Sequence, residues 1–325
     1  MNTLSLQAPT MAGKLILLAV AICAYLRFPR LMLRHYRKMG TFPRVGRPRS
    51  FSEKFLWRKL FDRDPRIARL SDKLLVKDYF RSRCPTLRVP ETLWVGRRPE
   101  DIPDELLEGS VAVKTNHGSN FNVFVENGEP ERRIVNGRIN HWFRFHTPYG
   151  QIDREWAYTR IDAKVFVEEL LRDRTGREPL QVIVHTYDGA PEFFLVLADT
   201  IGGPQTYAAF EPDGTRMVLD IPRLDREDTA FSDDFVLPDC FPAIMEDAAR
   251  LGSGFDYVRV DFLLVDGVAY ANEMTFYTNA GYPDVEDPAI LGRLTAPWDL
   301  RKSWFLTAPQ TGWRRLYADA LRASL

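Results

Sequence analysis

The sequence has few cysteines and lacks the short motifs that identify several common enzyme classes. Its three cysteines, Cys23, Cys84 and Cys240, lie far apart and form no CxxC pair. This spacing indicates neither a disulfide framework nor a zinc site, and it favours a reducing cytoplasm. No serine lies in a GxSxG elbow, and neither a GxxxxGK[ST] P-loop nor a GxGxxG after a strand is found. Serine hydrolases of that type and the usual nucleotide folds are therefore disfavoured.

A long hydrophobic run is lacking near the N-terminus, where the uncharged apolar segment Leu15–Leu26 has only twelve residues. A membrane-spanning helix needs about twenty, and a secretory signal would continue into a small-residue cleavage site where this chain has RFPR. The segment lies in a basic region, because Met1–Leu60 carries twelve Lys or Arg and one acid while the whole chain has 44 of each sign. We therefore expect a helix, packed either on the protein itself or, as we favour, on the inner surface of the cell membrane. Nucleic acid is not expected as a partner, because no helix-turn-helix, RNP-like or zinc-finger pattern accompanies the basic residues.

A lysine at the end of a short apolar run gives the first indication of a phosphate site. The stretch VAVKTNHGSNFN, from Val111 to Asn122, passes through Lys114 into a loop of small and amide residues. Backbone N–H groups of such a loop can converge on anionic oxygens, and the lysine adds a compact positive charge with three donors. The same pattern also fits a purely structural strand and turn. His117, inside this loop, could contact a nucleotide, shape the turn or face the acceptor substrate.

A predicted hairpin gives the second indication. Two β-rich runs, Tyr257–Val265 and Val268–Met274, flank an Asp-Gly pair that is typical of a tight turn. The pairing would bring Asp261 and Glu273 to one end of one face, where a hard cation such as Mg²⁺ or Mn²⁺ would remove their repulsion. Alternatively, Asp261 forms a structural ion pair with Arg259, and Glu273 is a solvated strand end.

Other segments have clear periodicity. We predict helices from Ser50 or Ser52 to Phe61 and over Arg69–Arg81. Phe241–Leu251 is expected to form an amphipathic helix that ends at Gly252 and packs on the Asp261 hairpin. A further hairpin is predicted around Asp188 and Gly189.

The sequence resembles the TupA-like branch of the ATP-grasp superfamily. The motifs that carry the resemblance are VAVKTNHGS at Lys114, RVDF at Arg259–Phe262 and NEMTF at Asn272–Phe276. Further pieces appear in the family's order, namely FSEKFLWRKLFDRDPR from Phe51, SDKLLVKDYF from Ser71, EWAY from Glu155 and VEELL from Val167. The resemblance implies an α+β protein with the ATP-grasp fold, in which two α+β subdomains grip the nucleotide. We divide the chain into a basic helical N-terminal extension (1–50), a helical lead-in (51–110), the ATP-grasp core (111–285) and closing helices (286–325).

The resemblance also implies the site residues. Lys73 and Lys114 would hold the phosphates of ATP, together with the loop residues Asn116, Gly118 and Ser119. The VEELL segment would be the adenine linker, with Glu168 and Glu169 as its candidates, although a surface acidic pair is the alternative. Likewise, Lys73 and Lys77 could belong to a solvated basic face. The Mg²⁺ or Mn²⁺ ligands would be Asp261, Glu273 and Thr275, and the catalytic residues Arg259, Lys114 and His117.

Three departures from the family pattern are apparent. Relatives carry a DYK-like triplet where this chain has Gln181, Val182 and Ile183, so one phosphate-facing lysine is missing. Asn120 and Phe121 replace glycines in the loop. Thr275 and Asn279 stand where the wider superfamily commonly has Asn and Pro-Gly, and a hydroxyl is a weaker metal ligand than an amide oxygen. These changes concern catalytic competence more than the fold.

The expected activity is that of an ATP-dependent carboxylate-amine ligase acting through an acyl phosphate. Because the TupA-like relatives are linked to teichuronopeptide and capsule synthesis, the carboxylate would be a glycan uronic acid and the amine an amino acid. Two alternatives remain: a glycosyltransferase-like enzyme of polysaccharide synthesis, and a catalytically impaired nucleotide-binding scaffold. The predicted location is the cytoplasm, at the inner face of the cell membrane.

Overall fold

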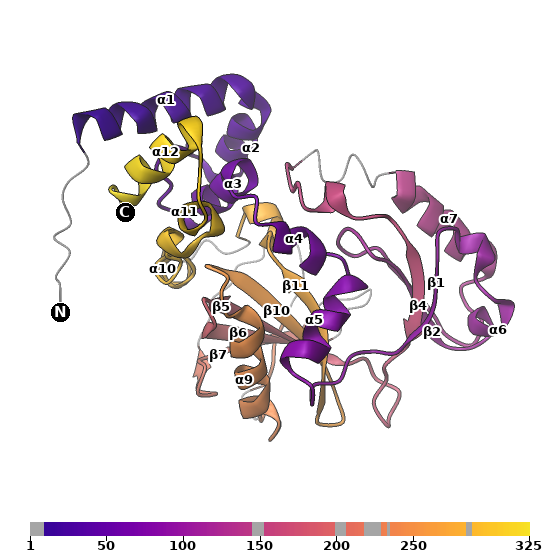
Figure 1. The fold of residues 1–325 in the computed structure, drawn as a ribbon. Coiled ribbons are helices and arrows are strands. Elements are labelled where there is room, and N and C mark those ends of the chain that lie inside the picture. Colours follow the sequence, from indigo (N-terminus) through magenta and orange to yellow (C-terminus); the bar gives the residue numbers. More distant parts are fainter. Residues whose placement is uncertain (1–9, 145–152, 199–205, 218–228, 233–234, 284–287) are drawn as a thin grey trace. The chain divides into compact units, whose positions relative to one another are not determined.

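The computed structural model describes residues 10–144, 153–198, 206–217, 229–232, 235–283 and 288–325. These residues form an α+β structure with two antiparallel sheets, as predicted (Figure 1). The chain divides into two compact units that are discontinuous in sequence, whereas the sequence analysis used consecutive segments. One unit joins Pro65–Ser253 to Val258–Phe276, and the other combines the chain up to Asp64 with Gly254–Tyr257 and Tyr277–Leu325.

The smaller sheet of the first unit has the order β1-β4-β2-β3. Its strands are β1 (Thr92–Gly96), β2 (Val111–Thr115), β3 (Asn122–Val125) and β4 (Val165–Glu169). Alternate residues, among them Val113, Val123 and Val167, are buried in one cluster with Val135 and Ile139 of α7 (Arg132–Arg144). Since successive side chains of a strand point to opposite faces, the intervening residues lie on the face away from α7. Short helices η1 (Pro99–Asp101), α6 (Asp104–Leu107) and η2 (Tyr158–Arg160) complete this region.

The larger sheet has the order β11-β10-β5-β6-β7-β8, with β9 beside β7. The strands are β5 (Leu180–Tyr187), β6 (Ala190–Ala198), β7 (Thr206–Phe210), β8 (Arg216–Met217), β9 (Thr229–Ala230), β10 (Val258–Val265) and β11 (Val268–Thr275). Both predicted hairpins are confirmed, and their Asp-Gly turns have positive φ at both residues. Helix α9 (Phe241–Gly252) packs on β5, β6 and β10, with Phe241 stacked on Phe194 at 4.5 Å between ring centroids.

The single helix predicted over Arg69–Arg81 is wrong. The chain instead forms α4 (Pro65–Leu70) and α5 (Leu75–Arg83) with a break between them. The break arises because one carboxylate oxygen of Asp72 accepts hydrogen bonds from the backbone N–H groups of Leu74 and Leu75, at 2.9 and 3.3 Å. Such a side chain competes with helical hydrogen bonding and starts a new helix. As a result Lys77, which the periodicity placed on the polar side, is buried.

The second unit is built around an aromatic core. Helix α3 (Phe51–Phe61) begins with the capping box of Ser50 and Glu53. Its Phe55 packs edge-on against Tyr257 and Trp298 at 5.4 and 4.8 Å. The remaining helices are α1 (Met11–Arg27), α2 (Pro29–Met39), η3 (Thr278–Gly281), α10 (Pro288–Thr295), η4 (Leu300–Lys302), α11 (Trp304–Thr307) and α12 (Gly312–Arg322).

The helices of this unit were also compared with the dimensions of a bilayer. In the described part of the chain, no single helix is long and apolar enough to cross a membrane. Helices α1 and α2 meet the length and composition criteria only as a pair, and the chain turns through 96° between them.

A buried histidine makes the stability of the first unit sensitive to acid. His185 on β5 stacks on Phe193 at 4.6 Å, and burial together with the nearby Arg259 guanidinium lowers its pKa to about 3. The unfolded chain binds this proton near pH 6.5, so between pH 6.5 and 3 the unfolded state holds a proton that the folded state lacks. We expect the free energy of unfolding to fall with decreasing pH in this window, by at most about 1.4 kcal/mol per unit from this group.

The measurement is urea unfolding of the wild type and of His185→Phe at several pH values from 7 to 4. The variant keeps an aromatic ring against Phe193 but has no titrating group, so its stability should depend less on pH. If the free energy of unfolding depended equally on pH in the two proteins, His185 would not be the group responsible.

Candidate functional site

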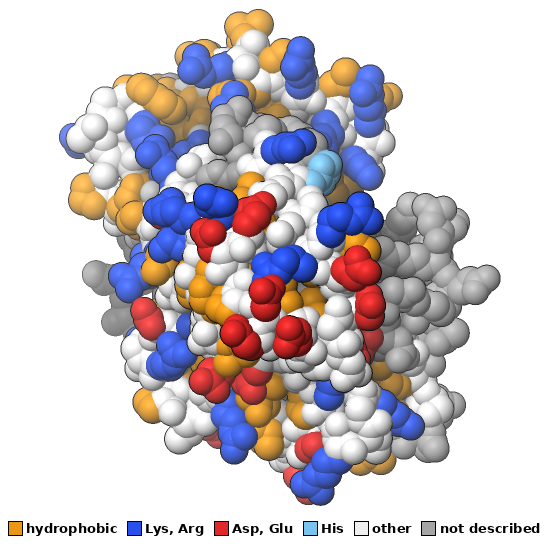
Figure 2. Space-filling model, turned by 90° about the vertical axis from the view of Figure 1, so that its right-hand side faces the viewer, with side chains coloured by type: hydrophobic (Ala, Val, Ile, Leu, Met, Phe, Trp, Pro, Cys, Tyr) orange, Lys and Arg blue, Asp and Glu red, His pale blue; other side chains and the backbone are white. Residues whose placement is uncertain are grey.

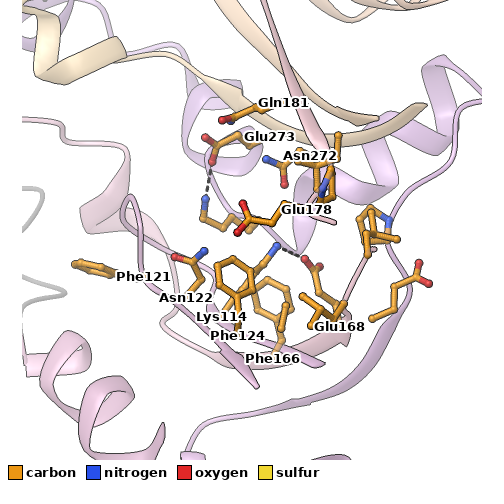
Figure 3. A pocket seen from close by; sticks show the side chains of 18 of the residues that line it. Lys114, Phe121, Asn122, Phe124, Phe166, Glu168, Glu178, Gln181, Asn272 and Glu273 are labelled. Carbon is orange, nitrogen blue, oxygen red and sulfur yellow. Dashed lines mark hydrogen bonds and ion pairs between the residues drawn. The ribbon is translucent and has the colours of Figure 1, made fainter. Parts of the chain in front are cut away.

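A cavity of about 570 Å³ lies between the two sheets of the first unit. Figure 3 shows side chains entering it from both sides, with Lys114, Phe124 and Glu168 from the smaller sheet and Gln181 and Glu273 from the larger. The alternation of the strands explains the composition of its wall. Because Val113, Val123 and Val167 face the apolar core, the cavity receives the residues between them, which are Ala112, Lys114, Asn122, Phe124, Phe166 and Glu168.

A buried cluster of two ammonium groups and one carboxylate occupies the smaller-sheet side. Glu168, only 3% exposed, receives hydrogen bonds from Lys114 on one oxygen and from Lys77 on the other, the latter at 2.8 Å. Burial would raise the pKa of Glu168, but Lys114 and Lys77 outweigh it and hold the pKa below its usual value. Lys77 also donates to the carbonyl of Pro90 and the hydroxyl of Thr92. The cluster has a net positive charge, as a polyphosphate site requires.

Lys73 enters the cavity from the break between α4 and α5. Its Nζ donates to Glu273 Oε2 at 2.5 Å, and its backbone N–H donates to the carbonyl of Asn116 at 3.0 Å. Asn116 is buried, and its amide binds Asp72, the carbonyl of Asp162 and the N–H of Lys164. The same Asp72 accepts hydrogen bonds from the N–H groups of Leu74 and Leu75 at the start of α5, so Asn116 and Asp72 together fix the backbone that carries Lys73.

The β10–β11 hairpin brings the predicted ionic residues together in register. Asp261 is paired with Glu273, and Arg259 with Thr275, so all four side chains share one face. Arg259 donates to both oxygens of Asp261, at 2.8 and 2.6 Å, and lies 3.6 Å from Glu273. The Arg259–Asp261 ion pair that the sequence analysis kept as an alternative is therefore present, whereas Glu273 is not a solvated strand end.

The two carboxylates differ in their affinity for a proton. Burial raises the pKa of Asp261, Arg259 opposes this effect and the neighbouring Glu273 adds to it, so that the pKa is raised to about 7. Glu273 experiences the same effect of burial, but Lys73 and Arg259 lower its pKa to about 2. The cationic neighbours thus outweigh burial at Glu273 but not at Asp261.

The donor set fits a hard divalent cation whose shell is completed by phosphate. Asp261, Glu273 and Thr275 offer only oxygen atoms, which Mg²⁺ and Mn²⁺ prefer, and cationic groups already lie against both carboxylates. Among the described residues, no group of three or more His, Cys, Asp or Glu side chains is arranged to hold a metal ion. This finding is consistent with a cation that is bound by two carboxylates and by the phosphates of a ligand, rather than by a closed cage of protein side chains.

The predicted loop residues lie less directly at the cavity. Asn120 and Phe121 line it, but Asn116, Gly118 and Ser119 do not. His117 is fully buried and stacks on Phe143, with 5.9 Å between ring centroids, and it is also outside the lining. Asn120, which replaces a glycine, has the positive φ of 59° that glycine adopts readily. The roles proposed for the loop backbone and for His117 stay predictions.

The second linker carboxylate has a different environment from the first. Glu169 lines the cavity, and its side chain accepts a hydrogen bond from the backbone N–H of Glu91 at 2.8 Å. Its own N–H donates to the carbonyl of Glu91 at 3.0 Å. Glu169 therefore anchors the linker to the segment before β1, while Glu168 binds the two lysines.

Several lining residues were not recognised in the sequence. Lys77 was identified one helical turn from Lys73, but its burial could not be derived from periodicity. Strand alternation from the hairpin turn would have placed Gln181 on the cavity side, two residues before Ile183. Asn272 begins the NEMTF motif but was given no role in the sequence analysis. No distinguishing pattern marks three further lining residues, Arg138, Arg172 and Glu178.

Comparison with protein families gives a match over most of the chain. The sequence model of the TupA-like ATP-grasp family matches residues 53–294. This range contains every side chain that lines the cavity. It also agrees with the fold class and the family expected from the motifs. A comparison with curated proteins gave no match.

Solved structures with a similar arrangement include three ligases or synthetases. The chain is 18% identical to D-alanine–D-alanine ligase from Bacillus anthracis, covering 71% of this chain and 67% of that one with a TM-score of 0.39. The identity to D-alanine–D-alanine ligase from Helicobacter pylori is 12%, over 74% of this chain and 64% of that one, with a TM-score of 0.41. The identity to D-cycloserine synthetase DcsG is 18%, over 80% of this chain and 72% of that one, with a TM-score of 0.36. The chain spans about two thirds of the length of these proteins.

Proposed function

Because the chain belongs to the TupA-like ATP-grasp family, we propose that it is an ATP-dependent ligase that joins a carboxylate to an amine. The observation that carries the proposal is the convergence of three lysines and an Asp261–Glu273 carboxylate pair at one cavity and the hairpin beside it. An ATP-dependent ligase needs cationic groups for the polyphosphate and a divalent cation beside them.

The position of each residue suggests its role in binding ATP or the metal ion. Lys114 and Lys73 would bind the phosphates of ATP, leaving their present partners Glu168 and Glu273. Glu168 keeps Lys77 when Lys114 turns to the nucleotide, so this buried carboxylate is never left without a cation. Glu273, Asp261 and Thr275 would hold Mg²⁺ or Mn²⁺, which supplies neutralisation of the charge on the transferring phosphoryl group.

The proposed reaction has two steps. The substrate carboxylate attacks the γ-phosphorus, the bond to ADP breaks, and an acyl phosphate forms. The amine then attacks the acyl carbon, phosphate leaves and the amine loses a proton, which gives the amide. Arg259, on the same strand face as Asp261, would leave that carboxylate and stabilise the oxyanion of the second step.

For the substrates we propose a uronic acid of a cell-surface glycan and an amino acid. This part depends on the link of the TupA-like family to teichuronopeptide and capsule synthesis. The test is an ADP-release screen of the purified full chain with Mg²⁺, ATP, uronic acids and amino acids, followed by the mass of the product. ADP release that requires both partners, with a product heavier by the amine minus water, is expected.

A scaffold that binds nucleotide without turnover is the second candidate, and Ile183 favours it. This side chain lies directly across from Asp261 on β5, at the position where relatives carry a lysine. Calorimetric binding of Mg-ATP without ADP release under any substrate pair would support the scaffold. Turnover of a sugar nucleotide without use of ATP would instead favour a glycosyltransferase-like enzyme and overturn both candidates.

A further inference from the structure

Helix α1 has an apolar face that is exposed along its whole length. Its members are spaced by three or four residues and therefore lie on one side of the helix. Their exposed fractions range from 50% to 78%, and they are Met11, Leu15, Leu18, Ile22 and Leu26. We call this set the outer face of α1. Large apolar side chains gathered in one continuous row, rather than scattered singly, indicate a binding surface.

The opposite side of α1 is packed on its own unit. Gly13, Leu17 and Ala24 are buried, and α12 packs along the helix. The contact with the loop before α3 is close, because a Cβ on Gly46 would lie 2.2 Å from the carbonyl oxygen of Leu17. Tyr25 adds a hydrogen bond to the carbonyl of Pro43 at 2.9 Å. Within the part of the chain that the structure describes, these contacts hold α1 by the side opposite the outer face and leave the outer face accessible to a partner.

The surroundings of the outer face are strongly basic. Nine Lys or Arg and no acidic residue precede Glu53. Lys14 and Arg27 lie at the two ends of α1, and α2 adds Arg30, Arg37 and Lys38, all exposed. Figure 2 shows the result, with hydrophobic and basic side chains together over the upper end of the view, where Figure 1 places α1 and α2.

This combination favours one partner over a second copy of the chain. In a symmetric dimer through α1, the same basic segments of both copies would come together with no acidic residue of that segment to offset them. An anionic lipid surface provides both an apolar layer for the outer face and negative charge for the cations. The exposed row extends over about 22 Å at 1.5 Å per residue, less than the roughly 30 Å of a bilayer core.

We infer that α1 lies in the plane of an anionic membrane surface with its outer face inserted, and that it attaches the protein there as a peripheral protein. The inference depends on the geometry and charge of α1 and α2, not on the ligase reaction. It would hold equally for a nucleotide-binding scaffold. It also defines the orientation of attachment, because the side that carries Gly13, Leu17 and Ala24 must remain on the protein.

The first experiment is co-sedimentation of the full chain with vesicles of phosphatidylcholine, with and without phosphatidylglycerol. Binding should require the anionic lipid and weaken as salt screens the charges. Replacing one basic residue of α1 or α2 by a neutral one should weaken binding by about fivefold. Leu18→Glu combined with Ile22→Glu should reduce binding at least tenfold. The control is Val236→Glu, which is compared with Leu18→Glu alone and places the same single charge on a side chain that is 81% exposed elsewhere. Equal binding of the wild type, the double variant and both single variants would overturn the inference.

Point substitutions are better than removal of α1, because the deletion would uncover Gly46 and α12 and could unfold the unit. Thermal unfolding of the double variant checks that its fold is retained. Sedimentation velocity without lipid tests whether a second copy of the chain binds the outer face instead. A dimer that the double variant dissociates would assign the outer face to a second copy and overturn the membrane assignment.

The second experiment uses Cys23, which is exposed on α1 and next to Ile22. In a Cys240→Ser background, a charged maleimide should label the exposed Cys23 readily in buffer. It should not label Cys84, because this thiol is buried and its pKa is raised to about 12. Anionic vesicles should slow the labelling several-fold, and neutral vesicles should not. Unchanged labelling on vesicles that bind the protein would show that another surface makes the contact.

Discussion

Asp261→Asn is expected to lower the rate of ADP release by about 10³-fold or more, because it removes one of two carboxylates available to a divalent cation at this site. The substitution preserves the shape of the side chain. Its amide oxygen can still accept a hydrogen bond from Arg259, which also lies 3.6 Å from Glu273. The fold should therefore survive the change, with a small shift in melting temperature, while turnover is lost.

The control for this variant lies on the same hairpin. Asp266→Asn makes the same chemical change at the turn between β10 and β11, where φ is 49° and asparagine is well tolerated. Its side chain is distant in register from Asp261. It contacts Arg174 through a long ion pair at 3.7 Å and accepts a long hydrogen bond from the backbone N–H of Arg174 at 3.5 Å. Normal turnover in Asp266→Asn together with loss in Asp261→Asn would locate the effect at the carboxylate pair. Normal turnover in both would remove the proposed metal site.

The hairpin is the part of the site that the sequence predicts best. A tight Asp-Gly turn predicts that the two strands pair and that Asp261 and Glu273 meet near the far end of the hairpin. Simple counting from the turn would pair Asp261 with Asn272, and an irregularity between Asp261 and Phe262 shifts the ladder so that Glu273 faces Asp261. Lys114 was likewise correctly placed on a strand, because an apolar run followed by small residues is typical of a strand that ends in a loop.

The site residues that the sequence did not predict depend on contacts between distant segments. Helical spacing put Lys77 on a polar face, but the break at Asp72 starts a new helix whose buried side includes Lys77. The reason for that burial is Glu168, 91 residues later in the chain, which compensates the ammonium. Asn116 was read as a phosphate-loop residue, although its amide is occupied by Asp72, Asp162 and Lys164. No local pattern contains such partners.

The two lysines on Glu168 should therefore respond differently to the same substitution. Lys114→Met should keep the fold, because Lys77 still compensates Glu168, and should reduce Mg-ATP binding and ADP release by roughly 10²- to 10³-fold. Lys77→Met should instead destabilise the protein by about 3 kcal/mol. The substitution removes the donor that binds the carbonyl of Pro90 and the hydroxyl of Thr92. It also removes one of the two ammonium groups that compensate the charge of the buried Glu168.

Urea unfolding and calorimetric titration with Mg-ATP measure the two effects separately on the same proteins. Lys77→Met combined with Glu168→Gln should recover part of the lost stability, because the buried carboxylate is no longer charged. Lys302→Met, at an exposed position of the other unit, is the matched control and should change neither quantity. If Lys114→Met lost as much stability as Lys77→Met while nucleotide affinity stayed unchanged, both lysines would be structural. The positive charge of the cavity would then belong to its framework, and the phosphates would have to bind elsewhere.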